Sequence, residues 1–162
     1  MLIKLKNKDT LIAGDFKLRC CIGKNGISKK KIEGDKTTPV GIFKLTSIYY
    51  RNDRVIKPET KLKVKKIIKT NGWCDDPTSP FYNKEISTIK KIKHEKLYRK
   101  DHKYDYLILI EYNTKKIVPN KGSAIFIHLT KNYENTAGCI ALKKKDFIIL
   151  LKLIDKKTKI KI

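Results

Sequence analysis

The sequence predicts a mainly β fold, an antiparallel-rich β-sandwich or barrel with one or two accessory helices. Most apolar runs are short, rich in β-branched and aromatic residues, and separated by clusters of Gly, Asn and Asp. Only one long stretch, after residue 139, carries apolar residues at clear helical spacing. The 162 residues fit one domain over 1–162, and no repeat or linker is visible.

The first elements are strands joined by tight turns. Residues 2–6 and 16–22 have strand character, and the turn-forming clusters at 7–9 and 23–26 follow them. Two glycines and a proline within 33–45 predict an irregular loop. That loop is expected to enter a further strand through Ile48, Tyr49 and Tyr50.

The middle of the chain is expected to be poor in regular structure. Residues 51–68 are basic and predict a loop or an edge strand. Residues 71–83 are dense in turn formers yet hold Trp73, Phe81 and Tyr82. A long loop rich in aromatic residues inside a compact domain is usually functional, although it can also fill the core.

The remaining elements are a short helix, strands and a longer helix. Residues 94–101 predict the short helix, and 104–112 predict a clear strand. An amphipathic helix with Asp146 in its first turn is predicted from the spacing of Phe147, Leu150, Leu151 and Ile154. A last alternating strand is expected to end at 160–162.

The net charge of +23 favours attraction to polyanions such as nucleic acid, anionic lipid or an acidic wall polymer. Only four of the 39 basic residues are arginine, the side chain best suited to bidentate phosphate and base contacts. Diffuse lysine without a reading motif indicates compositional bias, so no specific nucleic-acid partner is expected. A non-catalytic basic module that binds polyanions stays open as an alternative.

The cysteines show no CxxC pair and no metal-ligand spacing with the histidines, so neither a metal nor a cofactor is expected. Cys20, Cys21 and Cys74 are interpreted as structural thiols, and the neighbours Cys20 and Cys21 should point to opposite faces of a strand. The sequence has no apolar secretory signal and no run long enough to span a membrane. A cytoplasmic protein, or export by an unrevealed route, is the resulting expectation.

A candidate catalytic pair lies in 123–142, SAIFIHLTKNYENTAGCIAL. A buried strand over 124–127 delivers His128, a polar loop follows, and a Gly-Cys turn presents Cys139 before a second apolar run. An imidazole within hydrogen-bond reach can take the thiol proton and leave a stabilised ion pair. The competing interpretation is a satisfied histidine at a strand end and a small buried cysteine.

Taken together, segments spread over nearly the whole chain resemble an L,D-transpeptidase catalytic domain of the YkuD type, in family order. They are EGDKTTPVGIFKL at 33–45, YYRNDR at 49–54, NGWCDDP at 71–77 with FYN at 81–83, LYRKDHKYD at 97–105, GSAIFIHL at 122–129 and TAGCIAL at 136–142. The likeness is greatest to the compact, single-domain branch.

The resemblance implies a cysteine acyltransferase acting on peptidoglycan stem peptides. Cys139 would attack the diamino-acid carbonyl of a tetrapeptide stem and expel the terminal D-alanine. An amine of a neighbouring stem would resolve the acyl-enzyme to a 3→3 cross-link, or water would do so in an L,D-carboxypeptidase. Such enzymes typically accept carbapenems and work in the cell envelope or periplasm, and they need no cofactor.

Roles carry over to individual positions of this chain. His128 corresponds to the general base, and the backbone carbonyl of Leu129 to the group that orients its ring. The backbone N–H groups of Gly138 and Cys139 would form the oxyanion hole.

The chain departs from the commoner family pattern in three places, of which the first removes a possible oxyanion donor or second base and the second removes a candidate carboxylate anchor. Ala137 stands where many members have a histidine, and Ala141 stands where many have an arginine; the loop from His128 to Cys139 is also short. Substrate anchoring is therefore expected to fall to other side chains, each of which also has an interpretation as a surface or packing residue. The candidates are Arg51, Arg54, Trp73, Tyr82, Arg99 and Thr136.

Overall fold

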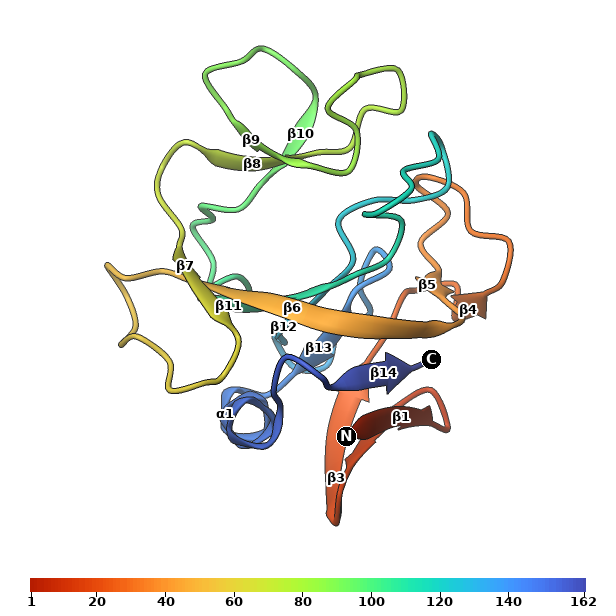
Figure 1. Cartoon of the computed structure of the whole chain (residues 1–162), viewed down its shortest axis with the longest axis vertical. Helices are drawn as coiled ribbons and strands as arrows, with labels where there is room; N and C mark the ends of the chain where they lie inside the picture. The colour runs from red at the N-terminus through yellow and green to blue at the C-terminus, as the bar shows by residue number, and fades with distance from the viewer.

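A computed structural model describes residues 1–162, and its central feature is a closed, mixed barrel of eight strands (Figure 1). The barrel strands follow the order β11-β12-β13-β3-β2-β1-β14-β6, and pairing of β6 with β11 closes the ring. Their bounds are β1 Leu2–Lys6, β2 Thr10–Ala13, β3 Phe16–Cys21, β6 Ile42–Tyr50, β11 Tyr106–Ile110, β12 Phe126–Leu129, β13 Ile140–Leu142 and β14 Lys159–Lys161.

Smaller elements surround the barrel. Strand β7 (Lys63–Lys66) extends the sheet in parallel from β6, and β4 (Ile27–Ser28) pairs with β5 (Thr38–Pro39). A separate three-stranded sheet is built from β8 (Asn71–Cys74), β9 (Glu85–Ser87) and β10 (His94–Lys96). The single helix is α1 (Lys144–Leu153).

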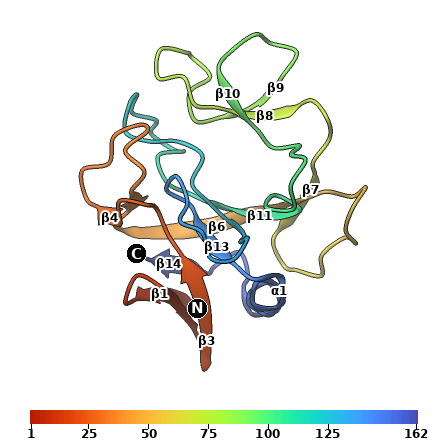
Figure 2. The same cartoon turned by 180° about the vertical axis from the view of Figure 1, so that it is seen from behind.

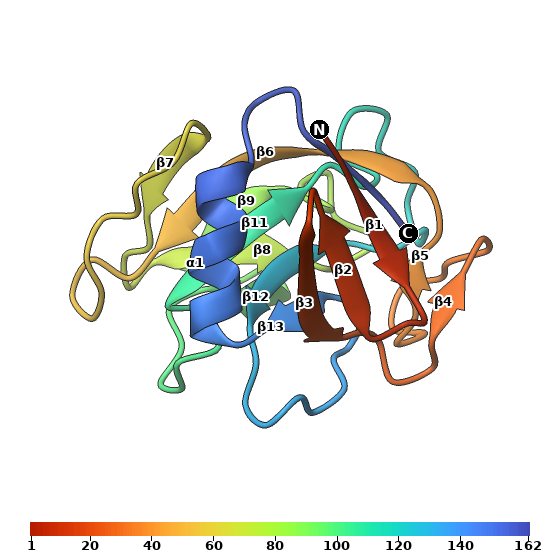
Figure 3. The same cartoon turned by 90° about the horizontal axis from the view of Figure 1, so that it is seen from below.

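The three-stranded sheet and the helix lie on opposite sides of the long strand β6. Figures 1 and 2 show β8, β9 and β10 above β6 and β11, with α1 below them. Figure 3 shows α1 beside the barrel, with the two chain ends at opposite ends of the parallel pair formed by β1 and β14. The barrel wall is therefore covered by different elements on its two faces.

Strand alternation divides the interior into two cores. In β12, Ile127 and Leu129 join the larger core of the barrel, whereas Phe126 joins the smaller one. The same alternation separates Tyr50 from Tyr49 in β6. Because neighbouring side chains of a strand point to opposite faces, each of these strands serves both cores. The smaller core, which includes Trp73 and Leu97, lies toward the three-stranded sheet.

The predicted mainly β fold with an accessory helix is confirmed, and of the two architectures the barrel is the one formed. Helix α1 has Asp146 in its first turn and buries Phe147, Leu150 and Leu151, as its spacing predicted. Its length and apolarity fall short of what a bilayer-crossing helix needs.

Three predictions about the middle of the chain were wrong in detail. Residues 94–101 form no helix, because His94–Lys96 pairs with β8 and edge pairing outweighs local helix preference. The expected loop at 71–83 begins as strand β8. The strand expected at 48–50 is only the end of the longer β6.

Phe147 is predicted to be essential for stability. Its ring is fully buried and stacks on Tyr106 with centroids 5.9 Å apart, so Phe147→Ala leaves a cavity in the larger core. We expect the free energy of unfolding, measured by urea titration, to fall by about 3–5 kcal/mol. The exposed helix residue Lys152 is the control, and Lys152→Ala should change it by less than about 0.5 kcal/mol.

Candidate active site

The register of two parallel strands brings Cys139 and His128 to one face of the barrel wall. Ile127 pairs with Ile140, and His128 pairs with Ala141. Cys139 immediately precedes β13 and joins the smaller core with Phe126, two residues before His128. Diagonal neighbours on adjacent strands lie about 7–8 Å apart at Cα, within reach of longer side chains.

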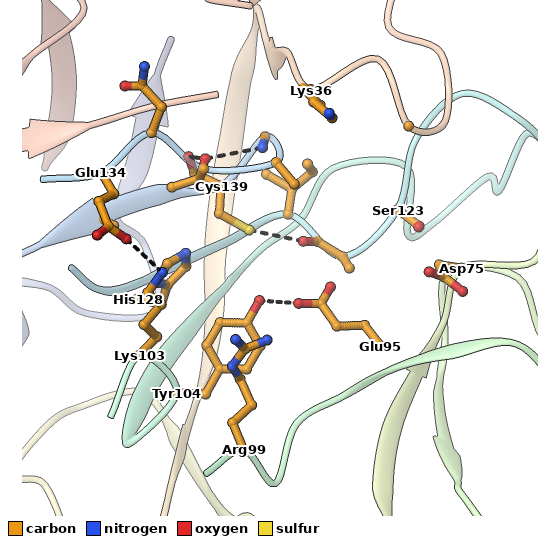
Figure 4. Close-up of a pocket in the computed structure, with 18 of the residues that line it drawn as sticks. Lys36, Asp75, Glu95, Arg99, Lys103, Tyr104, Ser123, His128, Glu134 and Cys139 are labelled. Atoms are coloured by element: carbon orange, nitrogen blue, oxygen red, sulfur yellow. Dashed lines mark hydrogen bonds and ion pairs between the residues drawn. The ribbon is translucent and has the colours of Figure 1, made fainter. Parts of the chain in front are cut away.

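Both side chains line one cavity of about 460 Å³ (Figure 4). Its wall is strongly charged, with acidic side chains from Glu33, Asp75 and Glu95 and basic ones that include Arg99 and Lys103. Apart from the Cys/His pair, its other lining residues include Lys31, Gly34, Lys36, Lys93, Tyr104, Ser123, Ala124, Ile125, Leu129, Thr130, Lys131, Glu134, Asn135, Thr136, Ala137, Gly138 and Ala141. A charged cavity of this size can hold a polar peptide.

The thiol of Cys139 is buried and already hydrogen-bonded. Its Sγ–H donates to the carbonyl oxygen of Ala124 at 3.2 Å, and the Phe126 N–H donates to Sγ at 3.3 Å. Burial raises the pKa of the Cys139 thiol to about 12, and the nearby Glu95 acts in the same direction. At rest Cys139 therefore carries a neutral thiol directed toward Ala124.

The ring of His128 is held in one tautomer. Its Nδ1 lies 2.9 Å from the Leu129 carbonyl oxygen, and only a protonated Nδ1 can donate to that acceptor. The other ring nitrogen, Nε2, is consequently the basic one. This contact is the one that the resemblance implied for Leu129. Tyr104 packs edge-on against the imidazole, with ring centroids 5.1 Å apart.

Burial keeps both members of the pair neutral at rest. It lowers the pKa of His128 to about 4, while it raises that of Cys139. The sequence pattern predicts a stabilised ion pair, but removing two charges from water opposes its formation before a ligand enters.

One of the two expected oxyanion donors is already engaged. The Gly138 N–H donates to Thr136 Oγ1 at 3.1 Å, and the Thr136 hydroxyl donates to the Cys139 carbonyl at 2.6 Å. The Cys139 N–H makes no hydrogen bond. Gly138 has φ +141°, and a Cβ there would lie 2.8 Å from the Thr37 carbonyl, so glycine is required.

The backbone beside the thiol is fixed by a buried asparagine. Ala124 has φ +52°, a left-handed conformation that is costly for a residue with a Cβ. The Asn83 side-chain oxygen accepts from the Ala124 N–H at 3.1 Å and from Trp73 Nε1 at 2.8 Å. Its Nδ2 donates to the carbonyls of Tyr112 and Asn113. Asn83 thereby ties the acceptor of the Cys139 thiol to the aromatic core.

Four of the expected substrate-binding residues do not line the cavity. Arg51 is buried, binds Asp53 and donates to the Arg99 carbonyl at 2.6 Å. Arg54 pairs with Asp105 and donates to backbone carbonyls at 3.0 Å. Both arginines therefore hold the segment around residues 99–105 in place.

Trp73 and Tyr82 also lie behind the cavity wall. The Trp73 ring packs edge-on against Phe126 with centroids 5.2 Å apart. The Tyr82 hydroxyl donates to Glu33 and accepts from the Gly122 N–H at 2.9 Å. Both aromatic rings pack against neighbouring side chains, so they support the site from behind and do not face the cavity.

Arg99 and Thr136 do line the cavity, together with residues that no sequence pattern indicated. Arg99 is paired with Asp101 through two nitrogens, at 3.0 and 2.6 Å. Among the missed residues, Glu95 accepts a hydrogen bond from Tyr104, and burial raises the pKa of Glu95. Lys31 stands in a run of lysines that indicates compositional bias, and only its burial distinguishes it from the other lysines.

A closed mixed barrel with a buried Cys/His pair on the wall of a charged cavity is the arrangement of a candidate cysteine-dependent active site. The family model for the L,D-transpeptidase catalytic domain, YkuD, matches residues 3–162. The chain therefore belongs to this family, which implies L,D-transpeptidase-type activity on peptidoglycan. Comparisons with curated proteins and with solved structures gave no significant match.

Asn83 is predicted to be a structural support of the site. Asn83→Ala leaves the buried Trp73 and Ala124 donors without an acceptor, and each orphaned group costs about 1–3 kcal/mol. We expect a loss of at least about 2 kcal/mol in the free energy of unfolding, measured in urea. Asn52 is exposed and makes no side-chain hydrogen bond; if Asn52→Ala destabilised the protein equally, this assignment would fail.

Proposed function

We propose that the protein is a cysteine-dependent L,D-transpeptidase that acts on peptidoglycan tetrapeptide stems through a thioester acyl-enzyme. The observation that carries the proposal is the common face of Cys139 and His128, which line one cavity in a chain of this family. Because the substrate is a wall polymer, we place its work in the cell envelope.

Acylation begins when a stem peptide displaces the resting contacts of the thiol. The Sγ–H leaves the Ala124 carbonyl and gives its proton to Nε2 of His128, while Sγ bonds to the stem's carbonyl carbon. The carbonyl π electrons move onto oxygen to form an oxyanion. Its collapse restores the carbonyl, breaks the C–N bond and releases D-alanine, whose amine takes the proton from His128.

Deacylation again uses His128 as the base. An amine of a second stem gives a proton to His128, attacks the thioester carbonyl and expels the thiolate, which recovers its proton. With a neutral amine of a second stem as the acceptor, the product is a 3→3 cross-link. Water in the same place would give the L,D-carboxypeptidase reaction.

The test of the nucleophile is incubation with purified tetrapeptide muropeptides, read by mass spectrometry. We expect wild type to release D-alanine and form 3→3 dimers, and Cys139→Ser to form neither. A carbapenem should likewise add to wild type and not to Cys139→Ser in intact-mass spectra.

Cys21→Ser is the matched control for this experiment. The Cys21 thiol already lies near polar partners, the Glu134 carbonyl at 3.1 Å and the Thr130 hydroxyl at 3.6 Å, so serine fits there. The control should keep full activity. The assignment of Cys139 as the nucleophile would be wrong if Cys139→Ser turned over the substrate, or if Cys21→Ser alone lost turnover.

His128 is predicted to act as a base over an unusually acidic range. Burial lowers its pKa to about 4, so Nε2 is unprotonated throughout neutral pH. We expect kcat/KM for acylation to be flat between about pH 5.5 and 7.5 and to fall as pH drops through about 4. A fall centred near the ordinary imidazole pKa of about 6.5 would contradict this.

His128→Gln separates the base from the packing. Glutamine is similar in volume and keeps an amide N–H donor, whereas alanine would also leave a hole and an unpaired carbonyl at this buried position. We expect acylation by the His128→Gln protein to be slower by about a hundredfold or more. Thermal melts of both proteins provide the folded fraction by which the rates are normalised.

A further inference from the structure

Lys31 is a buried cation beside the turn that carries the nucleophile. It lines the same cavity as Cys139, and only 4% of its surface is exposed. Its Nζ donates to Asp35 Oδ1 at 2.8 Å and to the Thr37 carbonyl at 2.9 Å. Lysine is rarely buried to this extent unless its charge is paired, so the position is a built one.

Two glycines make room for this side chain. A Cβ on Gly122 would lie 2.6 Å from Lys31 Cε, so any other residue there would collide with the stem of the lysine. A Cβ on Gly138 would lie 3.4 Å from Lys31 Nζ. The ammonium group is therefore in contact range of the residue that precedes Cys139.

The Lys31 ammonium is held by two hydrogen bonds and has one further N–H donor. Asp35 accepts from Lys31 and from the backbone N–H groups of Ile32 and Thr37, each at 2.8 Å. Although burial opposes it, these hydrogen bonds lower the pKa of Asp35 to about 2, so the anion persists at neutral pH. An ammonium has three N–H donors, and Lys31 spends two of them.

An oxyanion formed at Cys139 would also need a second hydrogen-bond donor. Thr136 occupies the Gly138 N–H, which leaves the unengaged Cys139 N–H as the single backbone donor of the expected pair. Burial dominates the pKa of Cys139, but Lys31 acts on it in the opposite direction, as a positive charge near the sulfur must.

We propose that the third N–H of Lys31, together with the Cys139 N–H, stabilises the oxyanion that forms when Cys139 attacks the stem carbonyl. This inference rests on the proposed function. In the tetrahedral intermediate, Sγ is bonded to carbon, the thiol proton is on His128, and the former carbonyl oxygen bears the negative charge. That oxygen accepts from Lys31 and Cys139 until collapse restores the carbonyl and expels the amine.

Two reactions of the same thiol distinguish an oxyanion donor from other roles. Acylation by a tetrapeptide passes through an oxyanion, whereas alkylation by iodoacetamide displaces iodide at carbon and forms none. Both require Cys139 to lose its proton. A residue that acts only on the thiol or on folding must affect the two reactions together, and an oxyanion donor must affect acylation more.

The primary variant is Lys31→Met, which keeps the aliphatic stem. We expect the acylation rate to fall about 10²–10³-fold, the cost typical of losing one oxyanion donor, while alkylation falls less than about tenfold. The double variant Lys31→Met with Asp35→Asn removes both charges of the pair, leaves no unpaired carboxylate and should show the same split. Melting curves establish that each protein is folded under the assay conditions.

The control is Lys30→Met, which removes an exposed ammonium next to Lys31 in the sequence but outside the cavity. Because solvent screens an exposed charge, its acylation rate should change by less than about threefold. A tetrapeptide amide tests whether Lys31 instead anchors the terminal carboxylate of the stem. The oxyanion role predicts an equal loss on the acid and on the amide.

Three results would overturn the inference: equal losses in acylation and alkylation, a loss confined to the acid substrate, or no loss in Lys31→Met. In each case wild type would still acylate, so the proposed transpeptidase would stand. Failure of wild type itself to react with tetrapeptides would instead reject the proposed function.

Discussion

The parallel register between β12 and β13 is the constraint on which the candidate site depends. Pairing of Ile127 with Ile140 places Phe126, His128 and Cys139 toward the smaller core, while the two isoleucines enter the larger one. A slip of one residue would exchange these faces, burying the imidazole in the barrel and exposing the isoleucines. The apolar content of the larger core therefore fixes the chemistry on the opposite face.

Burial is the second property that shapes the chemistry. A wet cleft would let Cys139 and His128 exchange a proton freely, but here the Cys139 pKa is about 12 and the His128 pKa is about 4. In the proposed mechanism, the cost of separating charge in the cavity is offset by hydrogen-bond donors that act when the oxyanion develops. A thiol that is neutral at rest also reacts slowly with other electrophiles and with oxidants.

The sequence allowed the fold class, the helix and the Cys/His pair to be predicted, because each depends on local periodicity or on motifs in family order. The roles of Arg51, Trp73 and Tyr82 could not be read in this way. An arginine or aromatic residue looks the same in sequence whether it faces a ligand or fastens a loop. Lys31 was missed for the converse reason: only tertiary burial separates it from the other 34 lysines, and no local pattern records burial.

The position of β14 in the barrel bears on how the molecule assembles. It lies between β1 and β6, so Ile3 and Phe43 meet the same residue, Ile160, from its two sides. Such ring closure joins residues that are far apart along the chain, and contacts of long sequence separation slow folding. Before closure, β1 and β6 would present unpaired edges able to join another chain. Competition between closing and aggregating is thus built into the order of the strands.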